Sequence, residues 1–111
     1  MSSKQATVTA DGYSNMMNMI EPYEKKEYCH LMQIAYDEFL KDNMNLEIKC
    51  PVLITYGECD KVGKVKQYCK MWNKKTGFPL VVIKNAGHNA NVDNPMETNQ
   101  IIDLFLQEVI L

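Results

Sequence analysis

The sequence predicts an α/β fold: a partial, doubly wound parallel sheet made of one βαβ unit and flanking helices. Two short runs, residues 50–57 and 79–83, have the continuous apolar, β-branched composition of strands buried on both faces. A helical pattern, Val65–Thr76, lies between them. A strand, a crossover of this length and a second strand form a parallel pair with a right-handed connection.

Each element of this unit has a clear local boundary. The first strand begins at Pro51 and stops at Gly57, and the second begins at Pro79. The intervening helix places Val65, Tyr68, Cys69 and Trp72 on one face, at steps of three and four residues. Gly77 follows that helix and suits the left-handed conformation of a helix end.

The residues before the unit are less regular. Pro22 suits a first helical turn. Over residues 22–42, apolar side chains recur at helical spacing: Cys29, Met32, Ala35, Tyr36, Phe39 and Leu40. Residues 6–10 are either a short strand or an extended lead-in, and Asp11-Gly12 indicates a turn. Met16, Met17 and Met19 suit one adaptable helical turn.

A last helix is predicted from Asn94 to the end of the chain. Asn94 is a suitable N-cap, Pro95 fits the first helical position, and Glu97 completes a capping box. We expect its buried face to hold Ile101, Ile102, Phe105, Leu106 and Val109.

Composition excludes several classes of function. The 111 residues carry a net charge of −2, and all 12 basic residues are lysines, so nucleic-acid recognition is disfavoured. No apolar run reaches the length of a membrane span, and the N-terminus lacks the apolar core of a signal peptide. Four cysteines form no C-x-x-C pair. These features predict a cytoplasmic protein with reduced cysteines that binds neither membrane nor nucleic acid.

Two loops leave the carboxyl ends of the predicted strands, residues 57–60 and 85–88. Parallel strands bring both loops to one edge of the sheet, where sites form in open α/β folds. Asp60 and His88 therefore meet although they are far apart in the chain. A carboxylate that accepts from one imidazole nitrogen fixes the tautomer and leaves the other nitrogen free to take a proton. We therefore predict Asp60 and His88 as a catalytic pair.

The residues around this pair resemble the α/β-hydrolase superfamily. Residues 48–60, I-K-C-P-V-L-I-T-Y-G-E-C-D, are similar to the segment that carries the acid of its catalytic triad. Residues 85–95, N-A-G-H-N-A-N-V-D-N-P, are similar to the segment that carries the histidine. The resemblance implies that Asp60 is the acid, that His88 is the general base, and that residues 46–111 are the C-terminal βαβα part of the fold. It implies a lead-in and a lid-derived helix for residues 1–45.

The family's serine nucleophile, in G-x-S-x-G, has no good match. Gly12-Tyr13-Ser14-Asn15-Met16 has the first glycine and the serine but a methionine in the last position. We interpret Ser14 as a loop or cap residue and expect the nucleophile in an N-terminal half outside this sequence. The chain is then a fragment, a split subunit or a truncated product.

Other residues near the pair have alternative roles. Glu58 is a second candidate for the acid, and we expect Asp93 to order the His88 loop through backbone amides. A metal held by Cys59, Asp60 and His88 is disfavoured because the spacing matches no familiar site. We expect no cofactor.

The sequence thus favours part of a serine-type, esterase-like acyl hydrolase acting on a small-molecule ester or acyl substrate, and inactive by itself. Two strands also need neighbours. We expect these from the missing N-terminal half or from a homo-oligomer that pairs strand edges. The alternative is a non-catalytic scaffold that associates through those edges.

Overall fold

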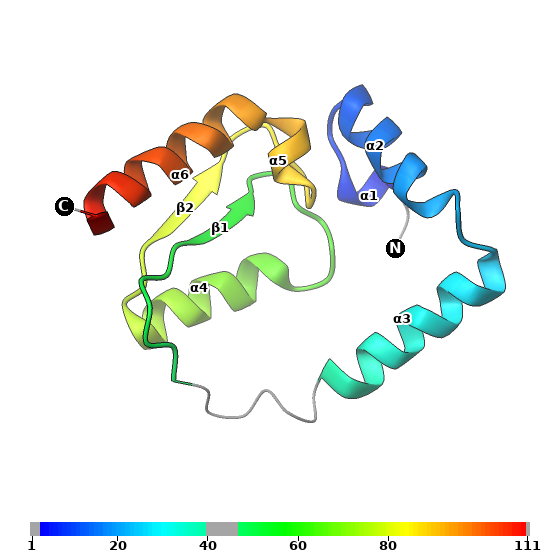
Figure 1. The fold of residues 1–111 in the computed structure, drawn as a ribbon, viewed down its shortest axis with the longest axis horizontal. Helices are drawn as coiled ribbons and strands as arrows, with labels where there is room; N and C mark the ends of the chain where they lie inside the picture. Colours follow the sequence, from blue (N-terminus) through cyan, green and yellow to red (C-terminus); the bar gives the residue numbers. More distant parts are fainter. Residues whose placement is uncertain (1–2, 40–46, 111) are drawn as a thin grey trace.

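The computed structural model describes residues 3–39 and 47–110. These ranges contain six helices and two strands, whose arrangement can be followed in Figure 1. The elements are α1 (Ser3–Ala6), α2 (Ala10–Ile20), α3 (Lys25–Phe39), β1 (Ile54–Gly57), α4 (Val65–Thr76), β2 (Leu80–Ile83), α5 (Ala90–Asp93) and α6 (Pro95–Ile110). The chain is thus a mostly helical arrangement around a small sheet.

The sheet is the predicted parallel pair. β1 and β2 lie in register from Ile54 opposite Leu80 to Gly57 opposite Ile83. α4 forms the crossover and packs against both strands, while α6 packs against β2. The two helices flank the sheet from opposite sides, which gives the layering of a partial α/β fold (Figure 1).

Burial of the sheet is incomplete. Both strands were expected to be buried on both faces, but only Ile54 and Ile83 among their large side chains are buried, and Thr55 is exposed. Each strand has one hydrogen-bonding neighbour within the described residues, so each also has an open edge. The cover that a central parallel strand needs is therefore not supplied by the described residues.

The N-terminal segment excludes one of the two forms expected for residues 6–10. These residues form no strand: α1 ends at Ala6, α2 begins at Ala10, and Thr9 before α2 is extended. Asp11-Gly12 is not a turn between elements but part of the first turn of α2. The physical reason is the N-cap Thr9, whose hydroxyl accepts a hydrogen bond from Gly12 N at 3.0 Å and so starts a helix there.

Helix α3 begins three residues later than Pro22, after a turn in which Tyr23 N donates to Ile20 O. Its predicted apolar face is largely uncovered: Cys29, Ala35 and Tyr36 are exposed, and Met32 is half-buried. Outside that face, Leu31 and Ile34 are also each 47% exposed. α3 makes no extensive contact with another described element and stands apart in Figure 1. Leu40, in the predicted extension of this helix, lies outside the described residues.

The two helices beside the sheet begin and end as predicted. α4 covers Val65–Thr76, and Gly77 adopts a left-handed φ of 76°. At the start of α6, the Asn94 side chain accepts from Glu97 N at 3.3 Å. Glu97 departs from a standard capping box, because its carboxylate accepts from the Asn94 side-chain amide and from Lys84 N rather than from Asn94 N.

The apolar face of α6 is only partly buried. Ile101 and Phe105 are half-buried, whereas Ile102, Leu106 and Val109 are 41–46% exposed and not buried as expected. All four cysteines are free thiols. No helix in the described ranges is long and apolar enough to cross a membrane.

Candidate active site

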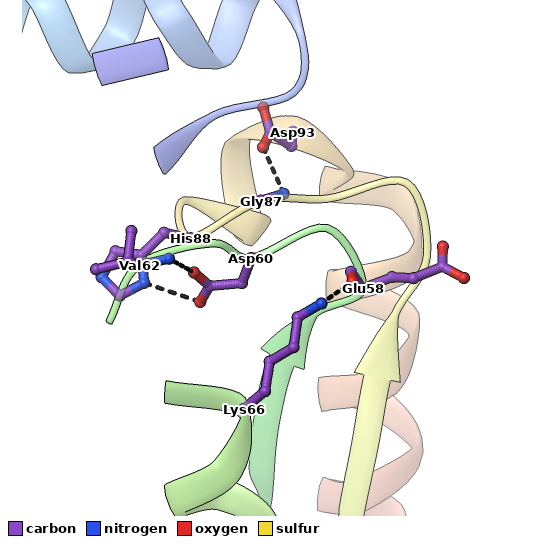
Figure 2. Close-up of polar contacts among 7 residues, drawn as sticks. All are labelled: Glu58, Asp60, Val62, Lys66, Gly87, His88 and Asp93. Atoms are coloured by element: carbon purple, nitrogen blue, oxygen red, sulfur yellow. Dashed lines mark hydrogen bonds and ion pairs between the residues drawn. The ribbon is translucent and has the colours of Figure 1, made fainter. Parts of the chain in front are cut away.

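Asp60 and His88 meet at the carboxyl edge of the sheet. The distance from His88 Nδ1 to Asp60 Oδ2 is 2.9 Å, although 28 residues separate the two in sequence. Figure 2 shows them converging from the two loops that follow β1 and β2. The parallel topology thus brings together the two residues that the sequence singled out.

The Asp60 carboxylate is held in place by its own loop. Its Oδ1 accepts from Val62 N at 2.8 Å, and Asp60 N donates to Gly57 O at 3.0 Å in a tight turn directly after β1 (Figure 2). The Asp60 side chain is only 2% exposed. A buried carboxylate with both oxygens occupied has little freedom to turn away from the imidazole.

The two loops are joined by main-chain hydrogen bonds. Glu58 N donates to Ile83 O and Cys59 N to Ala86 O, both at 2.8 Å. These bonds continue the β1–β2 pairing past the ends of the strands. They require a close approach at Gly57, where a Cβ would lie 2.1 Å from Gly87 O. Only glycine fits this position, which explains the glycine at the end of β1.

The arrangement defines the chemistry of the imidazole. An ionised carboxylate can only accept hydrogen bonds, so when Asp60 is ionised and the imidazole is neutral, Nδ1 carries the proton and Nε2 presents a lone pair. No described residue bonds to Nε2, and the His88 side chain is 37% exposed. An open hollow of about 230 Å³ adjoins the pair, with Tyr56, Asn91 and Val65 among its lining. The pair can therefore take a proton from a group that reaches Nε2.

Asp93 orders the His88 loop, and it also binds the N-terminal segment. Its Oδ2 accepts from Gly87 N at 2.8 Å and from Val8 N at 3.0 Å. Its Oδ1 accepts from the main chain of Thr9 at 3.1 Å and from the Thr9 hydroxyl at 2.8 Å. Figure 2 shows the carboxylate turned toward Gly87 and away from His88.

The hydrogen bonds to Asp93 also set its ionisation. Partial burial alone would raise the pKa of Asp93, but the hydrogen bonds from Gly87, Thr9 and Val8 outweigh burial and hold that pKa below its ordinary value. Asp93 is therefore an anionic clamp between the His88 loop and the residues before α2.

Glu58, the alternative acid, points away from His88. Its carboxylate accepts from Asn85 N at 3.1 Å, and Asn85 has a left-handed φ of 51°. Lys66 Nζ donates to the main-chain oxygen of Glu58. Glu58 thus fixes the turn after β2.

A bound metal ion or a reactive thiol would change the chemistry available to the pair. Within the described residues, no three His, Cys, Asp or Glu side chains are grouped so as to hold a metal ion. Burial, followed by the nearby charge of Asp60, raises the pKa of the Cys69 thiol. Cys69 is therefore held as a neutral thiol, the weakly nucleophilic form of cysteine.

Ser14 lies in the second turn of α2, on an exposed position. The stretch Gly12–Met16 is helical throughout and does not form the sharp strand-to-helix turn of a nucleophile elbow. The next residue, Asn15, accepts from the Asn89 side chain at 3.2 Å, so α2 lies beside the His88 loop. Within the described residues, Ser14 itself makes no hydrogen bond to His88.

Sequence reasoning missed the role of Thr9. Thr9 caps α2 and binds Asp93, a residue 84 positions away. A threonine directly before a helix is a recognisable N-cap signal. The partnership with Asp93 has no local signal, because it depends on where α2 docks.

Comparison with known proteins gives one informative match. No protein-family model matches the chain, and no solved structure does. The chain is 30% identical over 95 residues to the 1-acylglycerol-3-phosphate O-acyltransferase ICT1 of Saccharomyces cerevisiae, a match that covers 80% of this chain. It covers 24% of the yeast protein, so the chain spans about a quarter of the length of that relative.

Proposed function

We propose that this chain is the acid- and histidine-bearing, C-terminal part of an acyl-transfer enzyme of the α/β-hydrolase type. The observation that carries the proposal is the His88 Nδ1–Asp60 Oδ2 hydrogen bond at the carboxyl edge of a parallel sheet. Similarity to an acyltransferase supports the same reaction class.

The roles of the two residues follow from the pair. His88 Nε2 accepts the proton of an attacking hydroxyl as its oxygen bonds to the acyl carbon, and Asp60 stabilises the imidazolium that forms. His88 then returns that proton to the leaving group as the original acyl bond breaks. No cofactor enters this cycle.

The final acyl acceptor distinguishes two activities. Water as acceptor makes the enzyme an esterase-like hydrolase, and a second substrate's hydroxyl makes it an acyltransferase. The named activity of the yeast relative favours the second. Both activities use the Asp60–His88 pair in the same way, so we propose a small-molecule acyl ester or thioester as the donor.

We place the nucleophile outside this chain. Ser14 is on a regular helix, and the Cys69 thiol is held neutral. The 111 residues alone are then expected to take no fluorophosphonate label. Labelling that disappears in Ser14→Ala would show instead that Ser14 is the nucleophile.

A segment exchange tests the proposal directly. The yeast acyltransferase, with its matching segment replaced by this chain, is expected to transfer acyl groups to 1-acylglycerol 3-phosphate. His88→Asn and Asp60→Asn in that hybrid should each lower the rate by roughly 10³-fold or more. His30→Asn is the matched control, because His30 is an exposed residue of α3. A folded hybrid whose rate is equal in wild-type and His88→Asn form would refute the assignment.

A second candidate, a non-catalytic scaffold, is supported by the open strand edges and the exposed apolar side chains of α3. It predicts that the chain self-associates. It also predicts that the hybrid is inactive whether Asp60 and His88 are present or substituted. Sedimentation velocity and the segment exchange therefore separate the two functions.

A further inference from the structure

We infer that a hollow lined by Lys4, Lys61 and Lys66, here called the lysine hollow, binds the phosphomonoester group of the acyl acceptor. This inference rests on the proposed acyl-transfer function and narrows its substrate class to a phosphorylated alcohol. It concerns a part of the surface separate from the hollow beside His88.

The lysine hollow has a volume of about 450 Å³ and is built by three parts of the chain. Lys4 comes from α1, Lys61 from the loop after β1, and Lys66 from the first turn of α4. Residues of the N-terminal segment and of the acid loop complete the wall: Thr7, Val8, Glu58 and Cys59. Residues from the N-terminal segment and from the middle of the sequence thus converge on one hollow.

The charges of the hollow are unbalanced. Among the described residues, no carboxylate lies within ion-pair distance of Lys4, Lys61 or Lys66. Lys66 Nζ donates only to the neutral main-chain oxygen of Glu58. The Glu58 carboxylate, the one acidic group in the lining, accepts from Asn85 N. A lining with three lysines and one carboxylate that is already hydrogen-bonded favours a dianion such as a phosphomonoester.

The walls of the hollow are tied to the candidate active site. Asp93 binds Val8 N, and Asn89 N donates to Ala6 O at 3.1 Å, so the N-terminal wall is fixed to the His88 loop. On the other side, Cys59 and Lys61 are the immediate neighbours of Asp60. A phosphate in the hollow therefore contacts the loop that carries Asp60 and the N-terminal segment that is hydrogen-bonded to Asp93 and Asn89.

Titration of the full 111-residue chain with sn-glycerol 3-phosphate, followed by ¹H–¹⁵N NMR, tests the inference. We expect saturable shifts at Cys59, Lys61 and Lys66, and none with glycerol. The triple variant Lys4→Gln, Lys61→Gln, Lys66→Gln should weaken binding by about tenfold or more. The control Lys70→Gln, Lys74→Gln, Lys75→Gln removes the same charge from exposed positions of α4 and should change affinity less than about twofold.

A second variant guards against unfolding of the triple mutant. Lys61→Glu reverses one exposed charge in a loop and should also abolish the shifts. Circular dichroism of each variant verifies the fold. The inference would be overturned if the triple variant and its control lost affinity equally, or if the NMR shifts were spread evenly over the surface.

Two further measurements identify the phosphate source and separate this inference from the proposed function. Inorganic phosphate and vesicles of phosphatidylcholine with phosphatidic acid are compared with glycerol 3-phosphate. Binding only to the phosphatidic acid vesicles supports a lipid headgroup, binding of the free compounds supports a small acceptor, and binding of neither overturns the inference. His88→Asn should bind glycerol 3-phosphate like the wild type. If the lysine hollow binds glycerol 3-phosphate but the hybrid has no acyltransferase activity, the proposed function is contradicted and this inference is not.

Discussion

At the scale of single residues, the site consists of two carboxylates with different tasks. Asp60 binds the imidazole of His88, and Asp93 binds one backbone amide of the His88 loop and another of the N-terminal segment. The first favours the Nδ1-protonated tautomer of the His88 imidazole, and the second fixes the main chain that carries His88. Asp93 is therefore a positioning residue.

The Asp93 clamp has a measurable effect on stability. Asp93→Asn replaces one acceptor oxygen by an amide group that faces N–H donors, so we expect a loss of about 2–4 kcal/mol in the free energy of unfolding. Urea denaturation measures it. Asp103→Asn, an exposed site on α6 bonded only to Gln107, is the control and should change stability by less than about 0.5 kcal/mol.

The same clamp predicts a pH dependence. The pKa of Asp93 is lower in the folded chain than in the unfolded chain, where it is about 3.9. The contribution of the ionised Asp93 carboxylate to the free energy of unfolding is therefore complete above the pKa of the unfolded chain. It is lost as pH falls through the pKa of the folded chain. The stability difference between wild type and Asp93→Asn should shrink on acidification below about pH 4. A difference that grows on acidification would contradict the role of the ionised carboxylate.

The contact between Asp60 and His88 could be predicted from the sequence because it depends only on the topology of the sheet. Asp60 and His88 each follow a strand of a parallel pair, and that is sufficient to bring them together. The partners of Asp93 could be predicted only for the nearby amide of Gly87. Val8 and Thr9 are more than 80 residues away, and their contact depends on the docking of α2.

At the scale of elements, the strand ends and loops form one tightly packed unit. Gly57→Ala would place a methyl group 2.1 Å from Gly87 O and 2.4 Å from Ala86 O, both main-chain atoms. The two loops would have to separate, so we expect a loss of about 3 kcal/mol or more in thermal or urea unfolding.

Gly77→Ala is the matched control for this substitution. Gly77 has open space around it but a φ of 76°, so alanine should cost only about 1–2 kcal/mol through backbone strain. Equal costs for the two substitutions would show that the β1 and β2 loops are not in close contact.

Helix α3 is the element with the least tertiary support. An isolated helix of 15 residues is marginal in water, and α3 exposes Leu31, Ile34 and Tyr36. We expect its amides to exchange with deuterium at least about tenfold faster than those of α4 in a hydrogen-exchange experiment at low protein concentration. Equally slow exchange in both helices would show that another surface covers α3.

Elements with local signals were predicted closely, and those that depend on tertiary contacts were not. The apolar periodicity of Val65–Thr76, with Gly77 after it, and the Asn94-Pro95 start of α6 are local features, and both helices begin and end accordingly. The exposure of α3 and of Ile102 on α6 could not be predicted. Periodicity shows which face is apolar but not whether anything covers it.

At the scale of the whole molecule, the chain combines an ordered site with an open sheet. The parallel pair and its two helices position Asp60 and His88, while both strands keep a free edge within the described residues. That further strands complete the sheet stays a prediction. The division at residue 45 between a lid-derived segment and the βαβα part stays a prediction.

The central claim concerns the proton on His88, and long-range ¹H–¹⁵N NMR of the imidazole measures it directly. At alkaline pH, where imidazole is neutral, we expect protonated Nδ1 and unprotonated Nε2 in the wild type, with this preference lost in Asp60→Asn. Asp103→Asn should leave it unchanged. A wild-type ring protonated mainly at Nε2 would contradict the account, because that nitrogen could not then accept a proton.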